Sequence, residues 1–343
     1  MLTLTFLLLA ANASAGTSYL GNPDCLIANA HPVDNERASW TGGCKDGYAD
    51  GMGVLNWSVN GRPHGGYEGV LAHGVPNGPG FLLLANDATL QGNFKDGKLE
   101  GAGIYTSAHG NKLSATFQRG VPVGDVDFTS FEGDVYHGGW RDSRPHGRGK
   151  MTFVAGGTYE GGWANGEFSG KGVITYPNGE QVAREFHPQP QPPKPADQPS
   201  YGIRQEQPDT GTHIRHDAAY GFSVPPNLGY EQLTPEQQQL VKQPYKILLE
   251  GDEPPYPVNG PAAITKAFSE LAYKTQARGE VRLNVLIDTD GKPVSATILQ
   301  APDTELGKFA ANVLMLSKFK SARCGGKPCA MRYIYNTRFI IKL

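Results

Sequence analysis

The sequence predicts a mainly β chain with an α+β tail: an N-terminal sheet of repeated β-hairpins, a Pro-rich linker and a small α+β domain. Three observations predict this order. One unit of glycine and aromatic residues returns every 23 residues through the first half of the chain. Six prolines then fall within the twelve residues 188–199. Beyond residue 261, helical and strand periodicities alternate.

The repeated unit occurs six times, and the last five copies keep a constant step of 23 residues. A fixed period of this length is typical of a repeat array, in which each copy is one supersecondary unit that buries its apolar face against its neighbours. An array offers a surface before it offers a pocket, which lowers the expectation of an enzyme. The copies begin at Trp40, Tyr67, Leu90, Leu113, Tyr136 and Tyr159.

Inside each unit, glycine and apolar residues recur at fixed offsets. Eleven residues in, all six copies have glycine, and thirteen residues in, five of six have it, with Val126 as the exception. Glycine at fixed offsets indicates positive φ or a close backbone approach. We therefore predict two short strands per unit, joined as a hairpin, with apolar side chains facing inward. The predicted inward residues at the fifth position are Cys44, Leu71, Phe94, Phe117, Trp140 and Trp163.

The last full unit carries the clearest motif. It reads Tyr159-Glu-Gly-Gly-Trp163, then Asn165-Gly166, then Gly170-Lys-Gly172, and it resembles the MORN repeat. The resemblance covers residues 40–186, and residues 182–186 are predicted to form a truncated capping strand. The unit at 113–130 departs most, with Ala115 in place of a glycine, and we interpret it as a local irregularity or a bend. The resemblance implies a membrane-surface contact, a self contact or a protein scaffold, without choosing among them.

The overall charge is close to neutral but unevenly distributed. Residues 261–343 contain 13 Lys and Arg against 6 Asp and Glu, a net charge of +7, so the rest of the chain carries −9 of the total −2. This asymmetry indicates an acidic partner for the tail or contact between the two halves. The five histidines of the array are spread over several units without common ligand spacing, so no metal site is expected. No nucleic-acid motif is present, and nucleic acid is not an expected partner.

Residues 1–15 resemble an export signal. An apolar run from Leu2 to Ala11 precedes Ala13-Ser14-Ala15, a small-residue cleavage site, although no Lys or Arg precedes the run. The run is too short to span a membrane. We predict a cleaved signal peptide and a periplasmic protein, with an uncleaved inner-membrane anchor as the alternative. Residues 16–39 then form an N-terminal segment ahead of the array.

The four cysteines, an even number, agree with export and predict disulfides. Three pairings are possible, and the local one, Cys25–Cys44 with Cys324–Cys329, is the simplest. Cys25–Cys44 would hold the N-terminal segment against the first hairpin, since Cys44 takes a predicted inward position. Buried thiols and metal ligands are the alternatives, and no histidine lies close enough to complete a zinc site.

Residues 187–253 are predicted to be a linker. The proline cluster excludes a helix or central strand and favours an extended chain, and the abundance of Gln, Asp and Pro favours disorder. One short helix is predicted, with Thr234 as its N-cap, Pro235 in its first turn and Gln237 completing a capping box.

The remaining residues, 254–343, are predicted to form an α+β domain. Helical spacing predicts a helix over 261–275, and alternation predicts a strand over 281–287 that returns over 294–299 after the turn Asp288-Thr-Asp290-Gly291. A second helix is predicted over 303–319, with its inward residues at Phe309, Val313 and Leu316, and with Leu306 as a further inward candidate. A long last strand is predicted over 331–343.

This tail resembles the C-terminal domain of TonB, the periplasmic energy transducer of Gram-negative bacteria. The matching residues are Tyr256-Pro257, Gly279-Glu-Val281, Ile287-Asp-Thr-Asp290-Gly291, Lys318-Phe319-Lys-Ser-Ala322 and Gly326-Lys-Pro328. The resemblance implies that the domain binds an extended segment of an envelope protein. Glu253-Pro254-Pro255 stands where the family has Gln-Pro, and no membrane helix precedes the domain, so both features depart from a transducer.

Binding of an extended segment is expected to occur by strand addition, in which an edge strand pairs its free N–H and C=O groups with an incoming peptide. The last strand is the candidate, and the alternative is that it serves only the core. Its tyrosines would offer pockets and its arginines would attract acidic segments. The candidate contact residues are Arg332, Tyr333, Tyr335, Thr337, Arg338 and Phe339.

No catalytic constellation or cofactor motif is visible in the sequence. Asp288 and Asp290 could imitate a carboxylate pair, but a turn explains them. The leading hypothesis is therefore a periplasmic, non-enzymatic binding or scaffold protein with two contact modules. The alternatives are a TonB-type transducer for transport across the outer membrane, which needs a membrane anchor, and an envelope hydrolase, which no motif supports.

Overall fold

The computed structural model of the protein describes residues 18–29, 32–187, 201–205, 216–222, 224–275 and 279–339. The predicted signal peptide and most of the proline cluster lie outside these residues. The chain divides into two compact units. The first takes in the described parts of 1–151, 160–172 and 185–188, and the second those of 152–159, 173–184 and 189–343. The second unit thus includes two short stretches from the last repeats.

The first unit opens with a disulfide-bonded group of short strands. Strands β1 (Ser18–Asn22) and β2 (Cys25–Asn29) form a hairpin, and β3 (Glu36–Trp40) and β4 (Gly43–Lys45) both pair with β5 (Tyr48–Val59). The predicted disulfide Cys25–Cys44 is present and links β2 to β4. The prediction that Cys44 points inward is wrong, because β4 is a three-residue edge strand and all three of its side chains are exposed.

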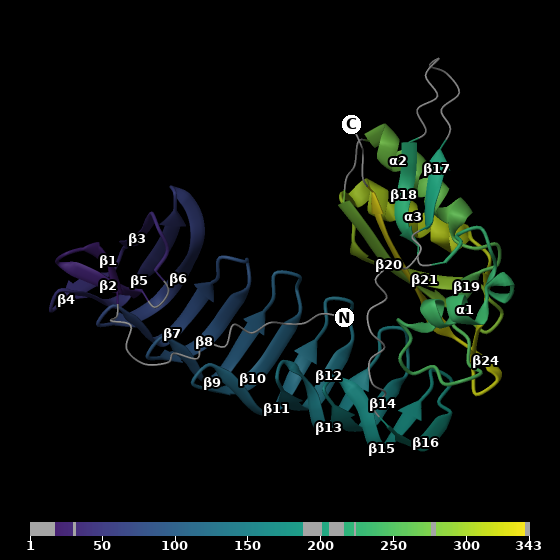
Figure 1. Cartoon of the computed structure of the whole chain (residues 1–343), viewed down its shortest axis with the longest axis horizontal. Helices are drawn as coiled ribbons and strands as arrows, with labels where there is room; N and C mark the ends of the chain where they lie inside the picture. The colour runs from purple at the N-terminus through teal and green to yellow at the C-terminus, as the bar shows by residue number, and fades with distance from the viewer. Residues whose placement is uncertain are drawn as a thin grey trace. The chain divides into compact units, whose positions relative to one another are not determined.

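From β5 to β16 each strand pairs with the next strand along the chain, within one sheet of 16 strands (Figure 1). Two strands per repeat, the predicted capping strand and the mainly β architecture are thereby confirmed. These strands are β6 (Arg62–Ala72), β7 (Val75–Leu83), β8 (Thr89–Lys95), β9 (Lys98–Thr106), β10 (Lys112–Gln118), β11 (Val121–Thr129), β12 (Val135–Arg141), β13 (Arg144–Thr152), β14 (Thr158–Ala164), β15 (Glu167–Thr175) and β16 (Gln181–Phe186).

The two repeated glycines have different physical reasons. The six glycines eleven residues into the units all have positive φ, between +65° and +113°, which side chains avoid. Four of the glycines thirteen residues in, Gly53, Gly80, Gly103 and Gly149, make room for a ring. A Cβ on Gly80 would lie 2.3 Å from the hydroxyl of Tyr67, and one on Gly149 would lie 2.3 Å from that of Tyr136.

The exception at Val126 lies in a unit that lacks a ring at its start, where Leu113 stands in place of an aromatic residue. Both side chains are buried, so the valine occupies volume that a tyrosine ring fills elsewhere. The absence of that ring does not by itself remove the glycine, because the unit that begins with Leu90 keeps Gly103, whose Cβ would lie 3.1 Å from the Phe117 ring.

The unit of Val126 keeps its hairpin, with a register shift between Ser114 and Thr116. Similar shifts occur in neighbouring units, between Gly69 and Leu71 and between Gly92 and Phe94. The predicted irregularity is therefore a bulge common to the repeats.

Aromatic contacts join consecutive repeats. The ring of Tyr67, at the start of the second unit, meets the ring of Phe94, at the fifth position of the third, edge-on with centroids 5.4 Å apart. Tyr136 and Trp163 repeat this contact between the last two units, at 5.3 Å. Such pairs stabilise by about 1 kcal/mol beyond the area that they bury. The core of the array is thus built from contacts between neighbouring repeats.

The second unit contains a five-stranded sheet in the order β17-β18-β25-β20-β21. Its strands are β17 (Tyr201–Gln205), β18 (His216–Phe222), β20 (Gly279–Ile287), β21 (Pro293–Gln300) and β25 (Met331–Phe339). Helices α2 (Ala262–Thr275) and α3 (Thr304–Leu316) contribute Phe268 and Leu306 to the core that covers one face of β20. The predicted first helix and hairpin are confirmed, together with the disulfide Cys324–Cys329. The last strand is confirmed over Met331–Phe339, and residues 340–343 of its prediction lie outside the described residues.

Helix α3 differs from its prediction in two respects. It ends at Leu316 rather than Phe319, because Phe319 and Lys320 form the short strand β22 (Phe319–Lys320), which pairs with β19 (Tyr256–Pro257). Its buried residues are Leu306, Gly307, Ala310 and Leu314, of which Leu306, Ala310 and Leu314 are spaced four apart. The predicted inward residues Phe309 and Leu316 are exposed, Leu316 at 86%. Gly307 brings the buried face of the helix close to β21, since a Cβ there would lie 3.4 Å from the side chain of Ile298.

Residues 224–253, within the predicted linker, pack into the second unit. Val224, Tyr230 and Leu233 belong to the same buried cluster as Phe268 and Val281. The short helix α1 (Pro235–Lys242) is present as predicted, with Thr234 and Gln237 forming the capping box. The domain boundaries remain predictions, but the packed structure begins some thirty residues before residue 254.

Adding a methyl group at Gly80 tests the contact between ring and glycine. Gly80→Ala should destabilise the chain by about 1–3 kcal/mol through overpacking, because the new Cβ meets the buried Tyr67 ring. Tyr67→Leu should remove most of this cost, since the pair then imitates Leu113 and Val126. Urea unfolding of the single and double variants measures the coupling, and additive effects would contradict the contact.

Ser143 gives a second test of the repeat geometry. It has φ of +61° at a turn position where the other five units have glycine with positive φ. Ser143→Gly should therefore stabilise the chain by about 1 kcal/mol. The reverse change, Gly120→Ser, should destabilise it by a similar amount, because only Lys98 lies near and strain is the main cost. Both are measured by urea unfolding, and a neutral Ser143→Gly would exclude strain at this turn.

Candidate peptide-binding edge

The candidate contact residues alternate along β25. Tyr333, Tyr335 and Thr337 are buried in the core. Tyr335 packs edge-on against Phe268, and its hydroxyl lies 2.7 Å from the hydroxyl of Thr265. Their side chains thus belong to the core, and what β25 has available for a partner is its backbone.

The backbone of β25 is paired on one side with β20 along its whole length, from Gly279 opposite Phe339 to Ile287 opposite Met331. On the other side, the N–H groups of Arg332 and Ile334 both donate away from β20. Backbone groups of an antiparallel strand alternate in direction, so those of Asn336 and Arg338 face the same outer edge. This outer edge, residues 332–338, is the candidate peptide-binding edge.

Groups of the second unit itself lie along this edge. The carbonyl of Ala155 accepts the Arg332 N–H at 2.9 Å, and the hydroxyl of Tyr245 accepts the Ile334 N–H at 3.1 Å. Strand β18 pairs with β25 at Tyr220 opposite Arg338, and β17 pairs with β18. Three separate segments therefore contact the edge, those that carry Ala155, Tyr245 and Tyr220, and each contact described here involves one residue of β25.

Arg332 and Arg338 are the two charged residues among the candidates. The Arg332 side chain is partly buried and donates through Nη1 to the carbonyl of Val154 at 3.2 Å. Its guanidinium is thus engaged within the unit. Arg338 and Phe339 are placed by their backbone only, opposite Glu280 and Gly279.

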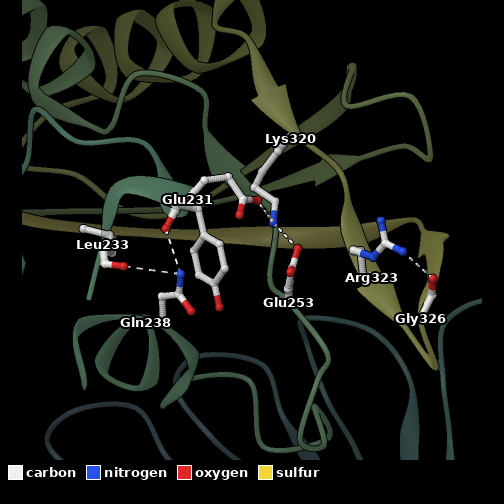
Figure 2. A network of polar contacts seen from close by, with 8 residues as sticks. Glu231, Leu233, Gln238, Glu253, Lys320, Arg323 and Gly326 are labelled. Carbon is white, nitrogen blue, oxygen red and sulfur yellow. Dashed lines mark hydrogen bonds and ion pairs between the residues drawn. The ribbon is translucent and has the colours of Figure 1, made fainter. Parts of the chain in front are cut away.

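A polar network fixes the segment that carries Tyr245. Lys320 forms ion pairs with Glu253 and, at 3.5 Å, with Glu231 (Figure 2). Its Nζ also lies 4.2 Å from the centre of the Tyr230 ring. One half-buried lysine therefore joins the segment to strand β22. Gln238 adds hydrogen bonds to the carbonyls of Tyr230 and Leu233.

Asp252 is the second fixed point of the segment. It is buried, and its carboxylate accepts hydrogen bonds from the Tyr176 hydroxyl at 2.5 Å, the Leu249 N–H at 2.9 Å and the Gly325 N–H at 2.8 Å. Three donors compensate for burying the charge. The Gly325 bond connects the segment to the hairpin of β23 (Ala322–Cys324) and β24 (Lys327–Cys329), which Cys324–Cys329 closes.

Sequence reasoning identified β25 but missed Tyr245, Asp252, Glu253 and Lys320. The available signal was the apolar content of residues 224–249, where Tyr230, Leu233 and Ile247 are all buried. The prolines and glutamines around them masked this signal. Asp288, which could imitate a catalytic carboxylate, accepts the N–H groups of Asp290 and Lys292 and forms the predicted turn.

A sheet of repeated hairpins followed by a small α+β domain defines a two-module repeat protein. Residues 265–341 match the family model of the Gram-negative bacterial TonB protein C-terminal region. Four stretches, 67–89, 91–112, 136–158 and 159–181, match the model of the MORN repeat. The chain thus contains MORN repeats and a TonB C-terminal domain, as the sequence resemblance predicted. The units beginning at Trp40 and Leu113 form hairpins without matching the model.

No curated protein matches this chain. The two matched families are non-enzymatic in general. The TonB family points to the Gram-negative envelope and to a protein partner, and the two disulfides fit an exported protein. Among the described residues, no helix has the length and apolar character needed to cross a membrane.

Buried tyrosines predict how the second unit responds to alkali. Burial raises the pKa of Tyr256 from 10 to about 12, and it also raises the pKa of Tyr230, Tyr245 and Tyr335. A raised pKa means that the unfolded chain loses its proton first. The contribution of Tyr256 is therefore complete below pH 10 and is lost as the pH rises from 10 towards 12.

Over that range the stability should fall by about 2 kcal/mol for Tyr256 alone. Urea unfolding at several pH values measures the slope, and Tyr256→Phe should make it shallower. Tyrosinate absorbance that shows Tyr256 ionising near pH 10 in the folded chain would contradict its burial.

Proposed function

We propose that the chain is a periplasmic, non-enzymatic binding protein, whose TonB-like domain captures an extended segment of an envelope protein by strand addition at the outer edge of β25. The observation that carries the proposal is the direction of the Arg332 and Ile334 N–H groups, which point away from β20. An incoming strand finds donors at regular spacing there, and strand addition takes its affinity from such main-chain bonds.

The charge of the tail supports an acidic partner segment. Residues 261–343 carry a net charge of +7, which raises the association rate of acidic segments. The buried tyrosines of β25 support a backbone mode of recognition, because their rings hold the strand rigid from behind. Pre-ordering of the strand lowers the entropy cost of binding.

The MORN array is proposed as a second contact surface. Strands β5 and β7 expose Met52 (66%), Val54, Phe81 and Leu83. The two strands lie on either side of β6 in the sheet. Exposed apolar side chains on nearby strands are typical of a surface that another molecule covers. The array and the tail would then contact different molecules or different parts of one molecule.

The periplasmic location rests on the disulfides and on the TonB family. The cleaved signal over residues 1–15 remains a prediction, as does the use of Arg332, Tyr333, Tyr335, Thr337, Arg338 and Phe339 in binding. The two Cys pairs each close a short loop, at Cys25–Cys44 and Cys324–Cys329, and such bonds persist in an oxidising compartment.

Site-specific photocrosslinking in Gram-negative cells tests the proposed capture. A photoreactive amino acid replaces Asn336, an exposed residue of β25, in the full chain. The matched control carries it at Thr297, an exposed residue of β21, at the opposite edge of the same sheet. An envelope protein should crosslink at Asn336 through one extended segment and should not crosslink at Thr297.

Equal labelling at both positions would show contact without edge recognition. Absence of an adduct at Asn336 from a folded, exported chain would contradict the proposed function. Mass spectrometry of the adduct identifies the partner segment, and its acidic content is the further expected result.

A further inference from the structure

The outer edge of β25 is covered by other segments of the chain. Tyr245 and β18 come from the predicted linker, and Ala155 comes from a stretch that clusters with the second unit. A strand edge with free N–H groups would be a site for unwanted pairing. What covers the edge here therefore decides when it becomes available.

The groups that cover the edge are arranged with the two-residue spacing of the outward N–H groups of β25. Arg332 and Ile334 are two residues apart, and each donates its N–H to a different acceptor, the Ala155 carbonyl and the Tyr245 hydroxyl. Four residues beyond Ile334, Arg338 pairs with Tyr220. These three contacts fall on alternate residues of β25, the same residues that an incoming strand would pair with.

The contacts differ from a continuous ladder. Tyr245 is buried and presents a side-chain hydroxyl rather than a backbone group. Ala155 presents one carbonyl, and in the described residues β18 meets β25 at a single register pair. One net hydrogen bond contributes about 1 kcal/mol, and a partner that adds a full strand forms several at once. A partner strand that forms several hydrogen bonds can therefore replace the contacts that cover the edge.

We propose that this chain occupies its own peptide-binding edge, with strand β18 and the Tyr245 hydroxyl holding the place of a partner strand, and that the partner binds by displacing them. The inference rests on the proposed strand addition and adds its regulation. Strand β18 runs antiparallel to β25. It therefore competes with a partner strand for the same edge. We call this segment, His216-Asp-Ala-Ala-Tyr-Gly-Phe222, the internal competitor.

The internal competitor supplies a probe that requires no knowledge of the partner. A labelled synthetic peptide with the sequence of residues 216–222 should bind an emptied edge. The part of the edge that β18 covers, at Arg338, is emptied in the full chain by Tyr220→Pro, because proline cannot be accommodated within a paired strand. A tethered strand competes at an effective concentration of about millimolar. The variant should therefore bind the peptide about tenfold more tightly than the unchanged chain, in fluorescence anisotropy.

Hydrogen exchange of single amides is the second measurement. Tyr220→Pro should speed exchange at the Arg338 amide by about fivefold, which corresponds to one net hydrogen bond. The Tyr335 amide should be unchanged, because it faces β20. Tyr245→Phe should speed exchange at Ile334. Its matched control is Tyr230→Phe, which removes a buried hydroxyl that has no hydrogen-bond partner among the described residues.

Equal peptide binding by the variant and the unchanged chain, or binding by neither, would overturn the proposal. Unchanged exchange at Arg338 in Tyr220→Pro would also overturn it. A peptide of scrambled sequence controls for non-specific binding. If these results hold but Asn336 captures no envelope protein, the edge is self-occupied and the proposed function fails. If Asn336 captures a partner while Arg338 exchange is unchanged, the proposed function stands and self-occupation fails.

Discussion

The array depends on one steric relationship, an aromatic ring lying over a glycine on the neighbouring strand. Tyr67 over Gly80 and Tyr136 over Gly149 leave no room for a Cβ. The ring can then reach forward to the next repeat, as Tyr67 reaches Phe94. The glycine, the ring and the 23-residue step therefore depend on one another, because the same ring contacts the glycine of its own unit and a ring of the next unit. In the unit that begins with Leu113 both the ring and the glycine are absent, and Val126 is buried in their place. The unit that begins with Leu90 keeps Gly103, which lies beside the Phe117 ring instead.

The tail domain depends on a different constraint, because β25 contributes its side chains to the core and its backbone to the candidate peptide-binding edge. The tyrosines of this strand are buried in the core, while its outer N–H groups meet Tyr245 and β18. Core packing holds the strand flat and extended, which is the form that strand addition requires. Asp252 and Lys320 then hold the covering segment in place through buried hydrogen bonds and ion pairs. Stability of the domain and accessibility of its edge are thus set by the same residues.

Much of this fold could be predicted from the sequence, because its strongest signals are local. The 23-residue step, the glycine offsets and the Thr234 capping box each report a backbone geometry that neighbouring residues determine. The four cysteines gave the right pairing for a similar reason, since each pair is close along the chain.

The residues that were missed depend on distant contacts. The apolar spacing of α3 allowed two stripes, and the choice of Leu306, Ala310 and Leu314 is made by the sheet beneath them. Tyr245 acquires its role from Ile334, far along the chain. Proline and glutamine around residues 224–253 suggested a linker, because composition reflects the average polarity of a segment. It does not show which few apolar side chains are buried in a core.

Because each repeat takes its core contacts from its neighbours, the array has no central residue on which all others converge. A duplication or loss of one 23-residue unit would leave the contacts inside the remaining units unchanged, since Tyr67 and Gly80 belong to one unit, as do Tyr136 and Gly149. The ends are different, since β1 to β4 and the Cys25–Cys44 bond finish one side of the sheet. The length of the array can therefore change over evolutionary time, while its terminal strands and its tail domain are inherited intact.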